Sequence, residues 1–177
     1  RKKFRNAQII GGNVATPSGV RDLVRAGADC VKVGIGPGGI CSTRVVTGVG
    51  VPQFSAVVNC ASTAKKLGVS IIADGGTNYS GDITKALAAG ATAVMLAGWF
   101  AGTEESPGEV IFRNNRRYKI HRGSASFMSQ IDASLRTGQT RNVHSVVAEG
   151  VEALIEYKGP VADVIYQLMA SLRSGMS

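Results

Sequence analysis

The 177-residue sequence has little cysteine and no long apolar run, and each shortage excludes a class of protein. Three cysteines without a Cys-x-x-Cys pair, together with two histidines, make neither a disulfide framework nor a zinc site. No uninterrupted apolar stretch approaches the roughly 18 residues of a membrane-spanning helix. Residues 1–5 are not followed by a secretory signal pattern. We therefore expect a protein of the reducing cytoplasm, with no membrane partner.

Acidic residues are absent from two short basic segments, which account for the net charge of +8. Residues 1–5 hold four Lys or Arg and residues 113–122 hold five, so the rest of the chain is close to neutral. Such patches fit a nucleic-acid binder, an enzyme with a phosphorylated ligand, or two solvated surface runs. Aromatic residues make up only 6% of the chain, which argues against a single-strand binder. No specific nucleic-acid partner is expected.

Short apolar runs without polar alternation predict strands that are buried on both faces, as in a parallel sheet. These runs are residues 8–11, 30–35, 70–73 and 93–97. Helical patterns fill residues 17–26, 53–66 and 80–89, with Thr16 and Ser80 as expected N-caps. Gly27, Gly68 and Gly90 follow these patterns and suit the turn after a helix. The order βαβαβαβ predicts a parallel sheet with right-handed crossovers.

The second half of the chain has a different character. Residues 102–158 are polar and basic, too long for an ordinary connection, and therefore resemble a lid or binding loop. Gly159-Pro160 marks the start of a final amphipathic helix over residues 161–173. Residues 1–101 hold four β/α units, which is half of an α/β (β/α)₈ TIM barrel. We expect 1–101 to be that half-barrel, 102–158 an excursion and 159–177 the final helix.

A small open α/β sheet is the alternative fold, but the turn after the first strand does not match the G-x-G-x-x-G pattern. If the chain is the C-terminal half of a barrel, its open sheet edges need the missing N-terminal half. The active site of a barrel lies where strands lead into βα loops. Those loops here are rich in glycine and reactive polar groups.

The richest loop, residues 32–44, reads KVGIGPGGICSTR. Its glycines bring the backbone close to a ligand, and its carbonyls could surround a hard cation. Cys41 stands among glycines and hydroxyls, as expected of a nucleophile, whereas Cys30 and Cys60 lie in apolar patterns and suit packing. Asp74-Gly75-Gly76 ends the third strand, and it is either a ribose and phosphate contact or a helix cap.

These motifs closely resemble the IMP dehydrogenase/GMP reductase family over essentially the whole chain. The segments that carry the resemblance are GNV at 12–14, GIGPGGICSTR at 34–44, TGVGVPQ at 47–53, ADGG at 73–76, SGD at 80–82 and AGTEESPGE at 101–109. The resemblance implies a (β/α)₈ barrel, usually a homotetramer, that acts on GMP or IMP with NADPH or NAD. The missing half would hold the early strands.

The resemblance also implies a role for individual residues. Cys41 is the nucleophile that forms a covalent adduct at purine C2, Thr43 is the catalytic threonine, and Glu105 is its expected relay partner. The carbonyls of Gly36, Gly38 and Cys41 match a potassium site. Asn13, Lys32 and Gly34 lie beside the nicotinamide. The expected substrate contacts are Gly39, Asp74, Gly75, Gly76, Ala97, Gly98, His121, Arg122, Gly123, Glu149 and Gly150.

Departures from the family pattern concentrate at the positions expected to bind the nucleotide phosphate and in the excursion, residues 102–158, which the resemblance identifies with a mobile flap. Gly39 and Gly98 stand where a serine is usual, and His121 replaces a tyrosine, so His121 and Arg122 are expected to add charge. Thr137-Gly138 occupies the place of the water-activating Arg-Tyr pair of dehydrogenases, and the nearest arginines are Arg136 and Arg141.

The sequence therefore favours GMP reductase, in which Thr43 and Glu105 relay a proton. IMP dehydrogenase is the alternative, and a non-catalytic nucleotide-binding half-barrel is another. In either enzymatic case the 177-residue chain is expected to be inactive alone.

Overall fold

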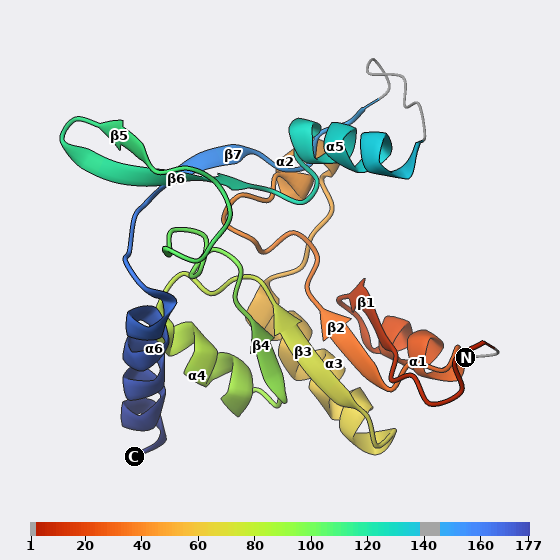
Figure 1. Cartoon of the computed structure of the whole chain (residues 1–177). Helices are drawn as coiled ribbons and strands as arrows, with labels where there is room; N and C mark the ends of the chain where they lie inside the picture. The colour runs from red at the N-terminus through yellow and green to blue at the C-terminus, as the bar shows by residue number, and fades with distance from the viewer. Residues whose placement is uncertain (1–2, 139–145) are drawn as a thin grey trace.

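The fold is known from a computed structural model, which describes residues 3–138 and 146–177. Arg141 and His144 lie outside the described residues. A four-stranded parallel sheet has the order β1-β2-β3-β4 (Figure 1). Its strands are β1 (Ile10–Val14), β2 (Cys30–Val33), β3 (Ser70–Asp74) and β4 (Ala93–Met95). The predicted α/β fold with a parallel sheet is confirmed. The first strand begins and ends later than predicted, so that Gly12 and Asn13 lie within it.

The helices that follow the strands form where the sequence predicts them. They are α1 (Pro17–Arg25), α3 (Gln53–Lys66) and α4 (Ser80–Ala88). Thr16 caps α1, since its side chain accepts a hydrogen bond from the Gly19 amide. The expected cap at Ser80 is wrong, because Tyr79 is the N-cap and the Asp82 carboxylate accepts its backbone amide at 2.9 Å.

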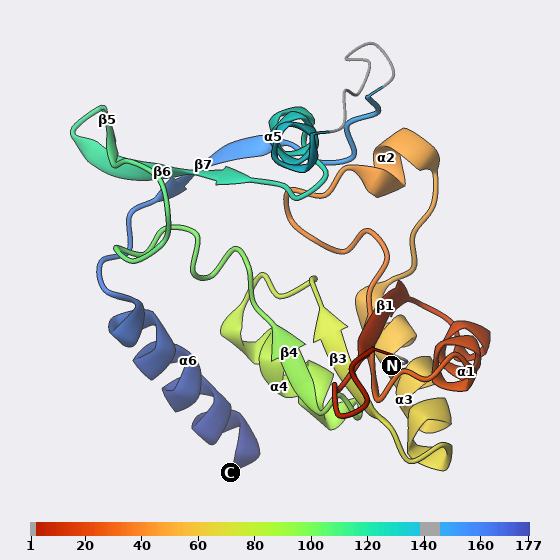
Figure 2. The ribbon, with the colours of Figure 1, turned by 45° about the vertical axis from the view of Figure 1, so that its right-hand side comes forward.

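Helices α1, α3 and α4 pack on one face of the sheet (Figure 2). Val31 and Val33 of β2 and Ile71 of β3 are almost fully buried against apolar residues of α3, including Val57 and Cys60. Alternate side chains of the strands lie on the other face. That face is open, since Ile10 is 59% and Met95 42% exposed. The core therefore stabilises one side of the sheet only.

The excursion is a folded layer rather than a long loop (Figure 1). It contains an antiparallel sheet of order β5-β6-β7 and a helix, neither of which the sequence predicted. These elements are β5 (Ile111–Arg113), β6 (Arg116–Arg122), α5 (Phe127–Thr137) and β7 (Glu152–Glu156), and a short helix α2 (Thr43–Thr47) lies beneath them.

The predicted final helix is present as α6 (Val161–Met176). It packs on α4 through Val164 and Leu168, which contact Ile83. The assignment of 1–101, 102–158 and 159–177 to separate parts stays a prediction. No helix in the described part of the chain is long and apolar enough to cross a membrane.

Most of the second basic segment is neutralised or used within the chain. Arg117 stacks on a tyrosine ring, and Lys119 is buried. Arg116 and Arg122 lie within ion-pair distance of carboxylates. Arg117 stacks on Tyr157, and Arg116 pairs with Glu156. Arg122 pairs with both Asp132 and Glu152. This pairing with neighbouring side chains fits the alternative of a solvated surface run.

The buried side chain of Lys119 leads to a prediction about the stability of the fold. It is only 3% exposed, and its ammonium donates hydrogen bonds to the carbonyls of Glu104 and Ser106 at 3.0 and 2.6 Å. Lys119→Met keeps the length of the side chain but leaves both carbonyls without this donor. We expect a loss of about 2 kcal/mol in the free energy of unfolding, measured by denaturant titration. An unchanged unfolding midpoint would show that water replaces the ammonium without cost.

Candidate active site

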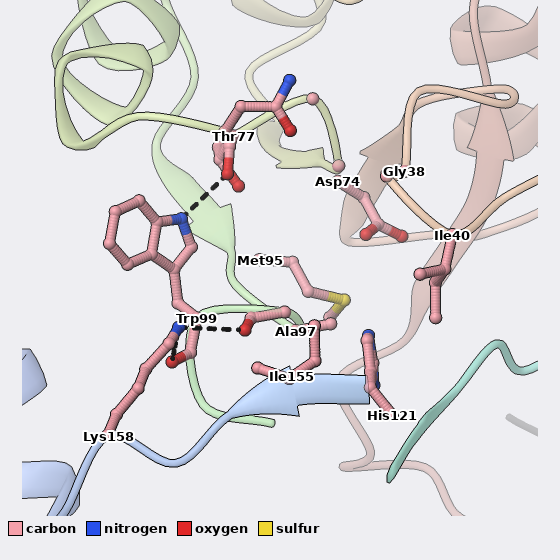
Figure 3. Close-up of a pocket in the computed structure, with 15 residues that line it drawn as sticks. Gly38, Ile40, Asp74, Thr77, Met95, Ala97, Trp99, His121, Ile155 and Lys158 are labelled. Atoms are coloured by element: carbon pink, nitrogen blue, oxygen red, sulfur yellow. Dashed lines mark hydrogen bonds between the residues drawn. The ribbon is translucent and has the colours of Figure 1, made fainter. Parts of the chain in front are cut away.

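Two adjoining cavities lie at the carboxyl ends of the parallel strands. The first, of about 400 Å³, is lined by Trp99 and Lys158 and is called the Trp99 cavity (Figure 3). The second, of about 360 Å³, is lined by Cys41 and Glu149 and is called the Cys41 cavity. Residues that line both cavities are Gly38, Ile40, Asp74, Gly75, Ala97 and His121. Because they share these residues, the two cavities adjoin and together offer two differently lined compartments.

A thiol, a hydroxyl and a carboxylate form a hydrogen-bonded chain in the Cys41 cavity. The Cys41 Sγ–H donates to Thr43 Oγ1 at 3.2 Å, and the Thr43 hydroxyl donates to Glu149 Oε2 at 2.8 Å. Cys41 is exposed to the solvent. A proton can pass along such a chain from the thiol to the carboxylate, which generates a nucleophilic thiolate.

The loop that carries Cys41 is held by backbone pairing with the segment around Glu149. The Ser42 amide donates to the Glu149 carbonyl at 2.9 Å, and the Val151 amide donates to the Ile40 carbonyl at 3.0 Å. Between them, Cys41 and Gly150 form an antiparallel bridge. The Cys41 thiol and the Glu149 carboxylate are therefore positioned by the same contacts, although 108 positions separate them in sequence.

Arg44 closes the other side of the same loop. Its Nη2 donates to the Val51 carbonyl at 2.7 Å. Its side chain runs past Gly36 and Gly50, where an added Cβ would lie 2.7 and 2.5 Å from Arg44 Cγ. A side chain at either position would therefore displace Arg44 from its present path and from its hydrogen bond to Val51.

Glu105 does not reach Thr43, so the predicted relay is corrected. The Glu105 carboxylate accepts the Val161 amide at 2.8 Å, at the start of α6. Lys119 binds the carbonyls of Glu104 and Ser106 on either side of it, which fixes the loop in this orientation. Glu149 takes the place beside Thr43 that the sequence assigned to Glu105.

Asp74 lies between the two cavities with one carboxylate oxygen already bound. Its Oδ2 pairs with Lys32 Nζ at 2.8 Å and accepts Asn13 Nδ2 at 2.9 Å. Asn13 Nδ2 also donates to the Gly34 carbonyl at 2.9 Å. Within the described residues Oδ1 has no hydrogen-bond partner and is free for a ligand hydroxyl. The three residues predicted beside the nicotinamide thus orient Asp74, and Asn13 and Gly34 also line the Cys41 cavity.

The loop carbonyls are of the type that an alkali cation binds. The Gly36 carbonyl has no hydrogen-bond partner among the described residues, while the Gly38 carbonyl accepts the Cys41 amide at 3.0 Å. The described residues contain no cluster of His, Cys, Asp or Glu suited to a metal ion. A ring of neutral carbonyl oxygens is a different kind of site, and its chemistry fits potassium better than a transition metal.

The Trp99 cavity contains groups that the sequence did not identify. The Lys158 ammonium lies 5.3 Å from the centre of the Trp99 ring and donates to the Trp99 carbonyl at 3.0 Å (Figure 3). The Trp99 indole donates to the Thr77 carbonyl at 2.8 Å, which joins the loops after β3 and β4. Burial lowers the pKa of Lys158. The pKa of His121 is also lowered, mainly by burial and to a smaller extent by the positive charge of Lys158. In the sequence Lys158 follows β7 and is far from the loops after the parallel strands. The glycine-rich loop pattern therefore gave no sign that it lines this cavity.

All the predicted substrate-binding positions line one cavity or both. Gly39, Gly76 and Gly98 line the Trp99 cavity. Arg122, Gly123, Glu149 and Gly150 line the Cys41 cavity. The remaining four line both: Asp74, Gly75, Ala97 and His121. The structure therefore brings the predicted positions together, and their roles stay predictions.

The three cysteines differ in exposure, which predicts their order of alkylation. Cys41 is exposed and hydrogen-bonded to Thr43, Cys30 is partly buried and Cys60 is fully buried. Burial also raises the pKa of Cys30 and of Cys60, which reduces their thiolate fraction. Iodoacetamide should label Cys41 at least about tenfold faster than the others, as measured by peptide mass spectrometry. Equal rates under native conditions would contradict the assignment of Cys41 as the reactive thiol.

Comparisons with known proteins find a family model that matches the whole chain. The family model described as "IMP dehydrogenase / GMP reductase domain" matches residues 1–177. The chain is 54% identical over 178 residues to an inosine-5′-monophosphate dehydrogenase of Aquifex aeolicus, covering 99% of this chain and 36% of the relative. Identity to the Bacillus subtilis protein of the same name is 53% over 176 residues, again covering 99% and 36%.

A solved structure is also similar. It is the C318A variant of GMP reductase from Trypanosoma brucei in complex with guanosine 5′-monophosphate, with a TM-score of 0.93 and 45% identity. The match covers 99% of this chain and 36% of the other. The chain thus spans little more than a third of the length of these relatives.

Proposed function

The chain belongs to the IMP dehydrogenase/GMP reductase family, and on that basis we propose that it carries the nucleophile and most of the nucleotide site of an oxidoreductase that acts at purine C2. The observation that carries the proposal is the hydrogen-bonded chain Cys41–Thr43–Glu149. A protein that only binds nucleotide has no need of an exposed thiol joined to a proton acceptor. The non-catalytic alternative is therefore disfavoured.

The first chemical steps do not depend on the direction of the reaction. The Cys41 thiol loses its proton through Thr43 to Glu149, and the thiolate sulfur bonds to C2 of the purine, which becomes tetrahedral. A nicotinamide cofactor supplies the hydride chemistry at this carbon when bound. Asn13 and Gly34, in the wall of the Cys41 cavity, would hold it, and their amide and carbonyl groups suit a carboxamide.

The preferred reaction is the NAD-dependent oxidation of IMP, because the curated relatives at 53–54% identity are named dehydrogenases. These relatives support the dehydrogenase alternative better than the reductase that the sequence favoured. After hydride has left C2, water must attack that carbon and Cys41 must depart. Once Glu149 has released the thiol proton to solvent, it can accept the proton of that water through the Thr43 hydroxyl. Cys41 leaves as a thiolate and takes up a proton again, so that IMP, NAD and water give XMP, NADH and a proton.

GMP reductase is the second candidate, favoured by two observations. Thr137 and Gly138 end α5 where a dehydrogenase has its Arg-Tyr pair, and the similar solved structure is a GMP reductase. Arg136 lies on α5. In this direction Glu149 and Thr43 deliver a proton to the leaving amine of the Cys41 adduct. GMP, NADPH and a proton then give IMP, ammonia and NADP.

The remaining nucleotide contacts follow from the two cavities. The free Oδ1 of Asp74 would accept the ribose hydroxyls, because Lys32 and Asn13 already hold Oδ2. Gly75 and Gly76, both with positive φ, would present amides to the phosphate. Potassium at the Gly36 and Gly38 carbonyls would hold the loop near Cys41. A homotetramer and a first barrel half supplied by the rest of the whole protein complete the proposal.

The assay that tests the proposal follows nicotinamide absorbance in the whole protein with each substrate pair. We expect NADH to form from IMP and NAD at least about tenfold faster than NADPH is consumed with GMP. The reverse ratio would establish the reductase. Binding of nucleotide without turnover of either pair would establish the non-catalytic alternative. The 177-residue chain assayed alone should show no turnover, because half of the barrel is missing; activity of this chain would overturn the half-barrel.

A further inference from the structure

Gln53 lies at the strand ends that carry the candidate active site, and the proposed function gives it no role. It is the last residue of the TGVGVPQ segment and the first residue of α3. Its side-chain nitrogen Nε2 donates one hydrogen bond to the Val33 carbonyl at 2.9 Å and another to the Asp74 carbonyl at 3.3 Å. Val33 and Asp74 are the final residues of β2 and β3. One side-chain amide therefore joins the ends of two neighbouring strands.

A second amide makes a parallel connection from β1. Asn13 Nδ2 donates to the Gly34 carbonyl and to Asp74 Oδ2, both at 2.9 Å. Gln53 thus holds the backbone of Asp74, whereas Asn13 and Lys32 hold its carboxylate. Because the side chain of an aspartate is short, a shift of its backbone moves the carboxylate with it. The direction of the free Oδ1 therefore depends on Gln53 as well as on Asn13 and Lys32.

The loops on both sides of Gln53 pack closely against its side chain. A Cβ added to Gly34 would lie 3.2 Å from Gln53 Nε2, and a Cβ added to Gly76 would lie 3.0 Å from Gln53 Cβ. Gln53 Oε1 is buried and has no hydrogen-bond partner among the described residues, so the donor bonds alone orient the amide. A substitution that removes the donor and keeps the volume would therefore free the ends of β2 and β3 to move apart.

We propose that Gln53 is a positioning residue for the ribose of the nucleotide, and that it acts through the backbone of Asp74. The inference rests on the proposed function, in which Asp74 Oδ1 accepts the ribose hydroxyls. Gln53 lines neither the Trp99 cavity nor the Cys41 cavity, so it does not act by touching the ligand. Its contribution is to the discrimination between nucleotides with and without those hydroxyls.

The test compares the affinities of IMP and 2′,3′-dideoxyinosine 5′-monophosphate, which lacks both ribose hydroxyls, by calorimetric titration of the whole protein. Gln53→Met keeps the length of the side chain and removes the donor. It should reduce the preference for IMP by about tenfold or more, the strength of a hydrogen bond to a charged group. The affinity for the dideoxy nucleotide should stay within about threefold.

Two further variants support this comparison. Gln53→Glu is nearly isosteric and lacks the donor when it is ionised, so it should show the same reduced preference for IMP. Gln167→Met makes the first change at an exposed position of α6. It is the matched control and should leave both affinities unchanged.

A double-mutant cycle tests whether Gln53 acts through Asp74. Asp74→Ala removes the carboxylate and keeps the backbone carbonyl that Gln53 binds. In this background Gln53→Met should change the preference for IMP by less than about twofold, because the group that it positions is gone. A reduction as large as that in the unsubstituted protein would overturn the inference, since Gln53 would then act by another route.

The outcomes separate the inference from the proposed function. If the unsubstituted protein binds neither nucleotide, the proposed function fails and the inference with it. If it prefers IMP and both Gln53 variants keep that preference, the inference is overturned and the proposed function stands. Equal losses of affinity for the two nucleotides would also overturn the inference, because they indicate a structural role only. If Gln53→Met does not fold, Gln53→Glu decides by the same comparison.

Discussion

Cys41→Ala should abolish turnover of the whole protein and leave its melting temperature and its affinity for IMP nearly unchanged. The thiol is exposed on a loop and fills no core space, so its removal leaves no cavity. Without sulfur no covalent bond to C2 forms, and Thr43 and Glu149 have no adduct to resolve. We expect a rate at least about four orders of magnitude lower, near the limit set by the loss of a nucleophile in other enzymes. Absorbance at the nicotinamide band and calorimetric binding of IMP measure the two effects.

Cys60→Ala is the matched control for that experiment. Cys60 is fully buried in α3 against the sheet, so the same chemical change there removes core packing. It should lower the free energy of unfolding by about 1 kcal/mol while turnover at a temperature well below melting stays the same. Appreciable turnover by Cys41→Ala would remove the covalent mechanism, whatever the result for Cys60.

Glu149→Gln should reduce turnover by about 10²–10⁴-fold, the usual contribution of a general acid or base. The amide keeps the size of the side chain and can still accept the Thr43 hydroxyl, whose distance to Oε2 is 2.8 Å. It cannot take up the proton. The loss should therefore appear in kcat, with the melting temperature little changed.

Glu105→Gln is the comparison that distinguishes the two glutamates. The Glu105 carboxylate binds the Val161 amide at the start of α6, and glutamine can still accept that bond. We expect turnover within about threefold of the unsubstituted protein and a slightly lower melting temperature. Losses of similar size for both variants would return the relay to Glu105 or assign a shared role to the two residues.

The parallel half of the fold could be predicted because its signals are local. Each strand is a short apolar run, each helix begins and ends at a recognisable residue, and Thr16 caps α1 as predicted. The cap of α4 failed because Asp82, three residues on, reaches back to the Tyr79 amide and makes Tyr79 the boundary. Strand β6 was not predicted because arginine and lysine occupy most of its positions. Its partner, β7, also lies about 30 residues further along the chain, so no local signal indicated the pairing.

The candidate site could be predicted where it consists of loops that follow strands. Cys41 and Asp74 lie in the cavities because parallel strands end at one edge of the sheet. Lys158 was missed because its position depends on the pairing of β6 with β7. Glu105 was assigned to the relay from the family resemblance alone, whereas the pairing of residues 149–151 with the Cys41 loop is not encoded by any local pattern.

The pairing of residues 40–42 with residues 149–151 has a consequence for fluctuations of the native state. The amides of Ser42 and Val151 are bonded across the same short ladder, with Cys41 and Gly150 between them. Hydrogen exchange at these amides therefore requires one shared local opening rather than two separate ones. That opening withdraws the thiol and the carboxylate together, so the free energy of a single sub-global event sets the fraction of molecules in which both are in place.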